Sequence, residues 1–294
     1  MTEHVIVTDA DGIRTIRMNR PDKKNALTLG MYEAMTAALE GANADDSVHC
    51  VLIAGVPGAF SAGNDLADFL KAAESTGGLN RPALRFLPAL VRCNKPLVAA
   101  VSGVAVGVGT TMLFHCDFVV AGSDAYFSTP FVNLGLIPEA ASSLLVPRLM
   151  GQRRAFEFLV MGHPLNATHA KEFGIANIVV APEDVDAEGL KAAREIAALP
   201  AGAVAISRAL MRGATDELLA RIDQEAKIFS ERLHSPRRKR PSKHSLHASG
   251  DADVAQRKDP LHHWRFSGHR ACDRAARRGT AFAWPHRQRG RRTA

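Results

Sequence analysis

The 294-residue sequence has few cysteines, few aromatic side chains and no long apolar run. Its four cysteines have no CxxC spacing, which argues against a disulfide scaffold and against a zinc ribbon. They are Cys50, Cys93, Cys116 and Cys272. No apolar stretch reaches the roughly 18 residues of a membrane-spanning helix, and the first residues lack the basic and apolar regions of a secretory signal. We therefore expect a cytoplasmic protein with reduced thiols, no metal site and no membrane partner.

The last residues, 236–294, lack glutamate and contain only three aliphatic side chains. They hold 16 of the 37 Lys and Arg residues against 4 Asp, so the excess of positive charge lies in this segment. Because the segment has little apolar surface to offset its ordering entropy, we expect disorder. The abrupt change in composition also fits a shifted reading frame near Ser235. The basic run at 237–241 could bind a polyanion, but we do not expect nucleic acid as a partner.

Residues 4–235 alternate strand-like and helix-like patterns, which predicts an α/β fold with mainly parallel pairing. Strands are predicted at 4–8, 13–18, 48–54, 96–101 and 117–121, the first two forming a hairpin around a turn at 9–12. Helices are predicted at 29–42, 142–150, 153–160, 167–172, 187–198, 203–212 and 216–233.

Two glycine-containing segments directly follow predicted buried strands. Residues 59–66 are AFSAGNDL, and residues 102–111 are SGVAVGVGTT. Small residues let a backbone approach a ligand, and a helix start offers free N–H groups. Two peptide donors from separate strand ends can converge on one carbonyl oxygen and stabilise an enolate or a tetrahedral anion. A tight packing turn explains either segment alone, whereas a dinucleotide site is excluded because the full GxGxxG pattern is absent.

These segments, taken in order, resemble the crotonase family of enoyl-CoA hydratases and isomerases. The resemblance rests on AFSAGNDL (59–66), NKPLVAAVSGVAVGVG (94–109) and CDFVVAGSDAYFSTPFVNLGLIPEAASS (116–143). The segments NRPDKKNAL (19–27) and PLNATHAKEFGIANIVV (164–180) fit the same family. The resemblance implies an α/β fold with a ββα spiral core and a C-terminal helical region. It also implies an acyl-CoA thioester substrate, with coenzyme A as part of that substrate and no separate cofactor, and a homotrimer or hexamer.

The resemblance divides the chain into three parts. Residues 1–200 would form the spiral core with the acyl-CoA site, and residues 201–235 a helical region that mediates trimerisation. Residues 236–294 depart from the family, whose members place a last helix there that contributes to CoA binding and trimer contacts. We therefore expect weaker CoA affinity or looser assembly than the family norm.

The resemblance also assigns roles to single residues. The backbone amides of Asn64 and Val108 would form an oxyanion hole in which their side chains need no particular identity. Lys24 would contact phosphate or adenine of CoA, and Ala26 would contact CoA through its backbone. The full set of implied substrate-binding residues is Lys24, Ala26, Ala62, Gly63, Asp65, Gly107, Thr111, Phe131 and Leu136. Core packing explains Phe131 and Leu136 equally well.

The sequence departs from the hydratases of this family where they carry two glutamates. Those positions are Thr111 and Phe131, neither of which can activate water. The segment TPFVNLGLIPEAASS resembles instead the Δ3,Δ2-enoyl-CoA isomerase branch, in which the glutamate at the position of Glu139 is the catalytic base. The alternative for Glu139 is an acid favoured by the dipole in the first turn of a helix. Asp65 and Asp68 are alternative bases.

The favoured function is therefore conversion of a 3-enoyl-CoA to the 2-trans isomer through a dienolate, as in fatty acid β-oxidation. Two alternatives stay open at this point. One is another crotonase reaction, such as enoyl-CoA hydration or thioester hydrolysis. The other is a non-catalytic acyl-CoA-binding protein.

Overall fold

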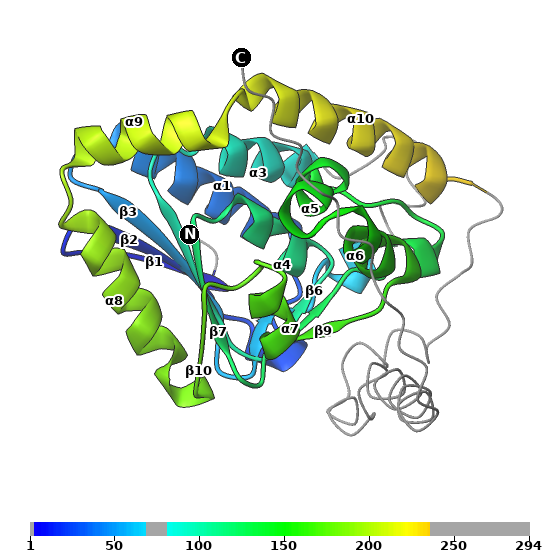
Figure 1. The fold of residues 1–294 in the computed structure, drawn as a ribbon, viewed down its shortest axis with the longest axis horizontal. Helices are drawn as coiled ribbons and strands as arrows, with labels where there is room; N and C mark the ends of the chain where they lie inside the picture. Colours follow the sequence, from blue (N-terminus) through cyan, green and yellow to red (C-terminus); the bar gives the residue numbers. More distant parts are fainter. Residues whose placement is uncertain (1–2, 69–80, 236–294) are drawn as a thin grey trace, which may run out of the picture. The chain divides into compact units, whose positions relative to one another are not determined.

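Two β-sheets along one spiral path of the chain form the framework of the protein (Figure 1). The computed structural model describes residues 3–68 and 81–235, so the predictions made for 236–294 lie outside the described residues. The larger sheet has six strands in the order β1-β2-β3-β5-β7-β10, and the smaller has four in the order β4-β6-β8-β9. The strands are β1 Val5–Ala10, β2 Ile13–Met18, β3 Cys50–Ala54, β4 Ala59–Ser61, β5 Leu97–Val101, β6 Val104–Val106, β7 Phe118–Gly122, β8 Tyr126–Ser128, β9 Leu165–Asn166 and β10 Ile178–Val180.

The larger sheet is parallel apart from its first strand. β1 pairs antiparallel with β2, and each later neighbour pairs parallel. The sequences of β3 (CVLIA) and β5 (LVAAV) are apolar throughout, and every residue in them is buried. Continuous apolar strands are typical of a parallel sheet that is covered on both faces. The predicted α/β class with mainly parallel pairing is confirmed.

Each turn of the spiral adds one strand to each sheet and then a helix. The successive units are β3-β4-α3, β5-β6-α4 and β7-β8-α5. Because β4, β6 and β8 are parallel neighbours, the residues that follow β4 and β6 meet at the same edge of the smaller sheet. This ββα spiral is the predicted core architecture.

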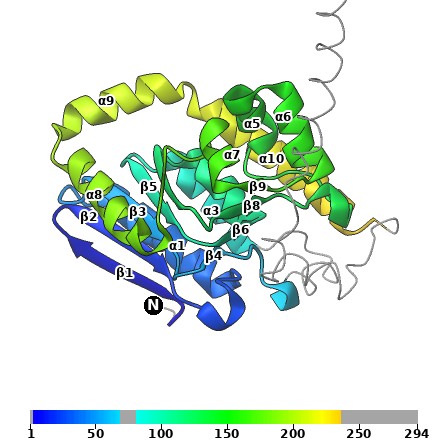
Figure 2. The same cartoon turned by 60° about the horizontal axis from the view of Figure 1, so that its bottom comes forward.

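Helices cover both faces of the larger sheet (Figures 1 and 2). The α-helices are α1 Leu29–Ala44, α3 Arg81–Arg92, α4 Val108–Thr111, α5 Ser142–Met150, α6 Gln152–Phe156, α7 Ala167–Glu172, α8 Val185–Ala197, α9 Ala201–Arg212 and α10 Thr215–Leu233. The shorter helical turns are η1 Pro21–Lys23, η2 Met112–His115, η3 Val132–Leu134, η4 Glu157–Met161 and η5 Pro182–Asp184. One face of the sheet packs on α8 and the other packs on α1 and α3.

The alternation of side chains along the strands explains these layers. Leu52 and Val98 share a buried cluster with Ala193 of α8, whereas Ile53 belongs to the cluster that contains Met35 of α1. Successive strand residues point to opposite faces. A fully apolar strand therefore supplies both layers of core.

Three local expectations differ from the structure. The first turn is shorter than the predicted 9–12, because β1 continues to Ala10 and only Asp11 (φ 54°) and Gly12 (φ 73°) form the turn, as in a two-residue hairpin. The segment predicted as one helix at 153–160 is α6 followed by a π-helical turn from Glu157. The helix α3 was not predicted, and it tolerates Pro88 in its interior.

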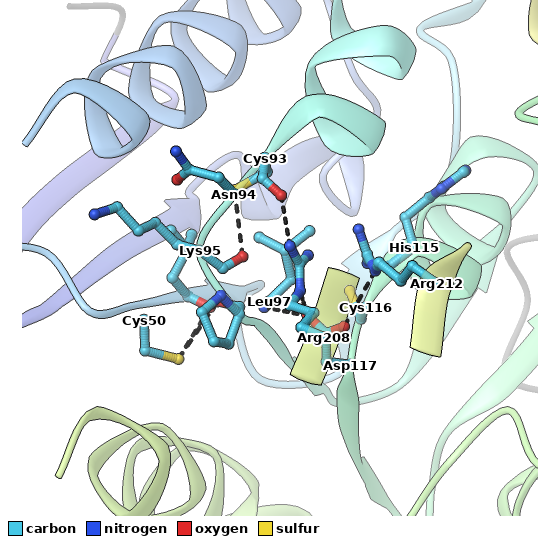
Figure 3. A network of polar contacts seen from close by, with 12 residues as sticks. Cys50, Cys93, Asn94, Lys95, Leu97, His115, Cys116, Asp117, Arg208 and Arg212 are labelled. Atoms are coloured by element: carbon cyan, nitrogen blue, oxygen red, sulfur yellow. Dashed lines mark hydrogen bonds and ion pairs between the residues drawn. The ribbon is translucent and has the colours of Figure 1, made fainter. Parts of the chain in front are cut away.

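The C-terminal helices α9 and α10 lie along one edge of the molecule (Figure 1). No residue of α9 is buried, and ionic contacts attach this helix to the core (Figure 3). Arg208 Nε lies 2.7 Å from Asp117 Oδ2 and Arg212 Nε lies 3.2 Å from Asp117 Oδ1. Arg208 also donates to the Cys93 carbonyl at 2.6 Å, and Arg212 donates to the carbonyl of His115. Asp117 thus joins α9 to the start of β7.

Within residues 3–68 and 81–235, no helix combines the length and the apolar character that crossing a membrane requires.

Candidate active site

The two glycine-containing segments lie side by side, as their strands predict. A Cβ atom on Gly63 would lie 2.8 Å from the Val106 carbonyl oxygen, and one on Gly109 would lie 2.6 Å from the Ser61 carbonyl oxygen. Real Cβ atoms do not approach oxygen this closely, so only glycine permits the contact. The segment after β4 and the segment after β6 therefore touch through their backbones.

Within residues 3–68 and 81–235, no backbone hydrogen bond from the amides of Asn64 and Val108 is seen. Asn64 forms a parallel bridge with Leu27 through the carbonyl of Gly63 and the amide of Asp65, so its own amide takes no part in that bridge. Gly107 precedes α4, and the first amide of that helix belongs to Val108. The first N–H groups of a helix have no intrahelical acceptor.

Tyr32 of α1 is buried beside the first segment. Its hydroxyl donates to Asn64 Oδ1 at 2.6 Å. The Asn64 side chain therefore has a defined partner, in addition to the backbone role expected of this residue. Burial, followed by the nearby Glu139 charge, raises the pKa of Tyr32 well above its ordinary value, so the phenol stays protonated and keeps donating.

Glu139 lies in the same region, since its charge acts on Tyr32. It is 7% exposed, and its Oε1 atom has no hydrogen-bond partner among the described residues. Burial, as the larger cause, and the charge of Glu225, as the smaller cause, raise the pKa of Glu139 to about 8. A carboxyl group with such a pKa can accept and return a proton near neutral pH.

The backbone around Glu139 is held at each residue. The Glu139 carbonyl accepts from Ser142 N at 3.0 Å and from Ser142 Oγ at 2.6 Å. The Ala140 carbonyl contacts His115 Nε2 at 2.8 Å, and the Ala141 amide donates to Glu225 Oε2 at 2.7 Å. The main chain is thus fixed while one side-chain oxygen of the acid stays unpaired.

The predicted CoA-binding segment is attached to the first glycine-containing segment. The Lys24 carbonyl accepts from the Ala62 amide at 2.9 Å, and the buried side chain of Asn25 donates to the carbonyls of Ala59 and Phe60. Lys24 itself is exposed. The carbonyl of Ala26 accepts from Arg20 Nη1 at 2.9 Å. Contacts of Lys24, Ala26, Ala62 and Gly63 with CoA stay predictions.

The two alternative acids are occupied by backbone and ionic contacts. Asp65 pairs with Arg20 at 2.7 Å and accepts from the amides of Ala67 and Asp68. Burial tends to raise its pKa, but the Arg20 bond and the amide bonds outweigh that effect and hold the pKa below its ordinary value. Asp68 Oδ2 accepts from the Leu29 amide at 3.2 Å. Glu139 differs from both in having a buried oxygen with no hydrogen-bond partner among the described residues.

Thr111 and Phe131, the positions at which the resemblance would place the two hydratase glutamates, lie close to this region. Thr111 is fully buried at the end of α4, and its Oγ1 has no partner among the described residues. Phe131 is buried, and its ring carbon Cε1 would lie 3.9 Å from a Cβ on Gly107. Phe131 shares an apolar cluster with Leu136 and Phe229 of α10. This cluster borders the second glycine-containing segment.

No group of three His, Cys, Asp or Glu side chains in the described part of the chain is arranged to hold a metal ion.

Comparison with known proteins agrees with this geometry. The family model described as "Enoyl-CoA hydratase/isomerase" matches residues 8–249. The chain belongs to this family. The "Enoyl-CoA delta isomerase 2" of Rattus norvegicus is 37% identical to this family member over 228 residues, covering 75% of the chain and 57% of the rat protein. The chain therefore spans less than two thirds of that relative.

Other relatives of this family member carry different names. The "1,2-epoxyphenylacetyl-CoA isomerase" of Escherichia coli is 33% identical, covering 76% of this chain and 88% of that protein. Among solved structures, OdaA of Pseudomonas aeruginosa is 40% identical with a TM-score of 0.76, covering 87% of this chain and 100% of that chain. These likenesses confirm the crotonase fold and membership of the enoyl-CoA hydratase/isomerase family.

For three residues of the candidate site, nothing in the sequence indicates that they lie there. Tyr32, His115 and Glu225 reach it from α1, η2 and α10, which are distant in sequence from Glu139. None belongs to a motif that indicates this role, because each acts through a tertiary contact. The ion pair of Arg20 with Asp65 was also not predicted, although Arg20 lies within a family motif.

Proposed function

We propose that this enzyme shifts the double bond of a 3-enoyl-CoA to give the 2-trans-enoyl-CoA. The Glu139 carboxylate removes a proton from C2, and the electrons move so that a dienolate forms with its charge on the thioester oxygen. Glu139 then delivers the proton to C4, which leaves the double bond between C2 and C3. Carbon, hydrogen and charge balance without water or an added cofactor.

The amides of Asn64 and Val108 are proposed to bind the thioester oxygen. The supporting observations are the backbone contact between their segments and the bridge at Leu27 that does not use the Asn64 amide. Preorganised donors of this kind each contribute on the order of 3 kcal/mol to transition-state stability. Tyr32 would hold the first donor in place through the Asn64 side chain.

One observation carries the choice of isomerisation over hydration. Glu139 is a buried acid on a held turn, and one of its oxygens has no partner within the described part of the chain. The family resemblance aligns Thr111 and Phe131 with the two hydratase glutamates. A 1,3-proton shift needs one base, but addition of water needs groups that orient and deprotonate the water. The name of the rat relative supports the same choice.

The CoA moiety is proposed to lie along the segment of Lys24 and Ala26 and the small residues Ala62 and Gly63. Asp65 would support this segment through its bond to Arg20. Gly107, Thr111, Phe131 and Leu136 would border the acyl group. The contact between Gly107 and Phe131 and the apolar cluster of Phe131 with Leu136 support this placement.

Self-association, as a homotrimer or hexamer, is also proposed. The supporting observation is the outer surface of α9, where Ile206, Leu210 and Met211 are 65%, 79% and 86% exposed. Apolar side chains gathered on one exposed helix are typical of an interaction surface.

The decisive experiment compares wild type with Glu139→Gln on a 3-enoyl-CoA and on a 2-enoyl-CoA. We expect isomerisation of the first substrate and its loss by at least about 10³-fold in the variant, because the carboxamide cannot take up the proton. Conversion of the 2-enoyl-CoA to a 3-hydroxy product by wild type would instead favour hydration. CoA affinity of the variant, measured by calorimetry, serves as the control for intact binding.

A further inference from the structure

The helix α5 begins with a residue that cannot cap it. Ala141 is the N-cap and has φ 54°, and the preceding Ala140 has φ 60°. Alanine has no side-chain acceptor, and a left-handed conformation of a non-glycine residue is unfavourable by roughly 1–2 kcal/mol. Two such residues in succession directly follow Glu139. This turn therefore needs support from elsewhere in the fold.

Glu225 of α10 supplies the missing cap from a distant part of the chain. Its Oε2 accepts from Ala141 N at 2.7 Å, and its Oε1 accepts from Ser143 N at 3.1 Å and Ser143 Oγ at 2.5 Å. Arg221 Nη1 in turn donates to Ser143 Oγ at 3.0 Å. Glu225 is 3% exposed. Ser143 is the N2 residue, whose amide a local N-cap side chain can also bind, and a negative charge is favourable at a helix N-terminus.

In all three hydrogen bonds between Glu225 and this turn, the turn donates and the Glu225 carboxylate accepts. The two backbone N–H groups can only donate, so they favour the ionised carboxylate. Burial nevertheless raises the pKa of Glu225 above its ordinary value, and the bonds from Ser143 and Ala141 and the Arg221 charge act against that shift. Two negative charges then lie near one another when Glu139 is also ionised, which agrees with the effect of Glu225 on the Glu139 pKa.

We infer that Glu225 is a positioning residue for Glu139, which fixes the strained turn carrying that carboxylate and places a second negative charge beside it. The inference rests on the proposed role of Glu139 as the base. Glu225 touches neither substrate nor reacting atoms in this account. It acts on the rate through the geometry of residues 139–141 and on the working pH range through its charge.

Other titratable groups face Glu139 from the packed elements, but their charges do not change in the same range. The pKa of Tyr32 is raised well above its ordinary value, so it stays neutral. Burial is the main cause that lowers the pKa of His115 to about 4. The ring is therefore neutral above that pH, and it donates to the Ala140 carbonyl. Arg221 donates to Ser143 Oγ at 3.0 Å. The charge that tunes Glu139 is therefore that of Glu225.

The test uses two substitutions of Glu225 and one matched control. Glu225→Gln removes the charge at nearly constant size, and Glu225→Asp keeps the charge but withdraws it by one methylene. Glu217→Gln is the control, because Glu217 also joins α10 to α5, through Arg148 at 2.7 Å and 3.0 Å, but on the exposed surface. Isomerisation rates are measured from pH 5.5 to 9.5.

We expect both Glu225 variants to lower kcat at pH 9, on the order of 10²-fold for a misplaced base, with little change in KM. Glu225→Gln should also move the midpoint of the acidic limb down by about one pH unit, because a like charge is removed. Glu225→Asp should keep the wild-type midpoint. Glu217→Gln should match wild type in both kcat and the pH midpoint. A Glu225→Gln profile equal to that of Glu217→Gln overturns the inference.

A second readout separates this inference from the proposed function. The carboxyl carbon of Glu139 is titrated by NMR in 13C-glutamate-labelled protein, with the signal assigned by its loss in Glu139→Gln. Its midpoint should fall in Glu225→Gln even if wild type proves inactive on 3-enoyl-CoA. An unchanged midpoint refutes the inference whatever the substrate. If Glu225→Gln fails to fold, Glu225→Asp decides through its kcat, since wild-type kcat at an unchanged midpoint also refutes it.

Discussion

At the scale of single residues, the candidate active site depends on one acid kept out of water and on glycines that let two backbones touch. Glu139 has a buried oxygen that no other described residue hydrogen-bonds, while Asp65 and Asp68 are engaged with backbone amides. An acid with satisfied bonds holds structure, whereas an unsatisfied buried acid has a shifted proton affinity and an atom free to react. This contrast separates three carboxylates that lie within one region.

The pH dependence of the rate follows from the Glu139 pKa. Burial, with the Glu225 charge second, raises it to about 8, and the base must be ionised to accept a proton. We expect kcat/KM for 3-enoyl-CoA to fall about tenfold per pH unit below about pH 8. Initial rates in constant-ionic-strength buffers measure this. A rate that is flat down to pH 5 would show that a different group is the base.

The same shift makes a prediction about stability. The neutral form of Glu139 is favoured in the fold. Its contribution to the free energy of unfolding is therefore fully present below the ordinary pKa of 4.5, and it is lost as the pH rises to about 8. Glu139→Gln should match wild type in urea unfolding at pH 4.5 and exceed it at pH 9. Each pKa unit corresponds to about 1.4 kcal/mol, so a difference of several kcal/mol is expected. Equal stability at pH 9 would contradict the raised pKa.

The contact between the two glycine-containing segments can be tested at Gly109. A Cβ there would lie 2.6 Å from the Ser61 carbonyl oxygen, so Gly109→Ala should push the segments apart. We expect kcat/KM to fall on the order of 10²-fold, since the paired donors would no longer converge. Gly202→Ala is the control, because nothing lies within 4 Å of that Cβ position. Similar losses in both variants would argue against the proposed oxyanion hole.

At the scale of elements, the C-terminal helices are attached to the core by polar contacts that also reach the Glu139 turn. Arg212 of α9 binds the carbonyl of His115, whose ring binds Ala140. Glu225 of α10 binds Ala141. Two helices near the end of the described chain thus support one turn of the spiral core.

Asp117 is the residue on which the α9 attachment depends. It pairs with Arg208 and Arg212, and its Oδ2 accepts from the Leu97 amide at 2.8 Å. Asp117→Asn should lower the free energy of unfolding by about 2 kcal/mol, because it leaves partly buried guanidinium groups without a counter-charge. Arg148→Gln breaks an exposed pair and should change the free energy of unfolding far less than Asp117→Asn does. Urea denaturation that gives equal losses would contradict this account of α9.

At the scale of the whole molecule, the fold joins a covered core with one helix that buries none of its own residues. α9 is held by Arg208 and Arg212 and directs apolar side chains outward. Exposed apolar surface of this kind is unfavourable in water unless a partner covers it. The proposed self-association would cover it.

The assembly prediction concerns two side chains of α9. The double substitution Leu210→Glu and Met211→Glu should lower the particle mass measured by light scattering after size exclusion, because two charges would be buried in the contact. Leu210→Met keeps the apolar surface and should leave the mass unchanged. A monomeric wild type would contradict the proposal, as would an unchanged mass in the double variant.

Local sequence patterns predicted much of the fold. Helices 142–150 and 167–172 match α5 and α7 at both ends, and the apolar runs at 48–54 and 96–101 lie over β3 and β5. These elements follow from side-chain periodicity and from continuous burial, which neighbouring residues encode. The helix α3 escaped prediction because two prolines interrupt its pattern.

The sequence by itself determined the α/β class with mainly parallel pairing, the positions of the two glycine-containing segments and the acid that follows Pro138, and its family resemblance implied the spiral. Only the tertiary structure decided that Tyr32 holds Asn64, that Glu225 caps α5 and that Asp65 is bound by Arg20. The physical reason is range. Periodicity and motifs record interactions between near neighbours, whereas the raised proton affinity of Glu139 comes from burial and from a charge that only folding brings beside it.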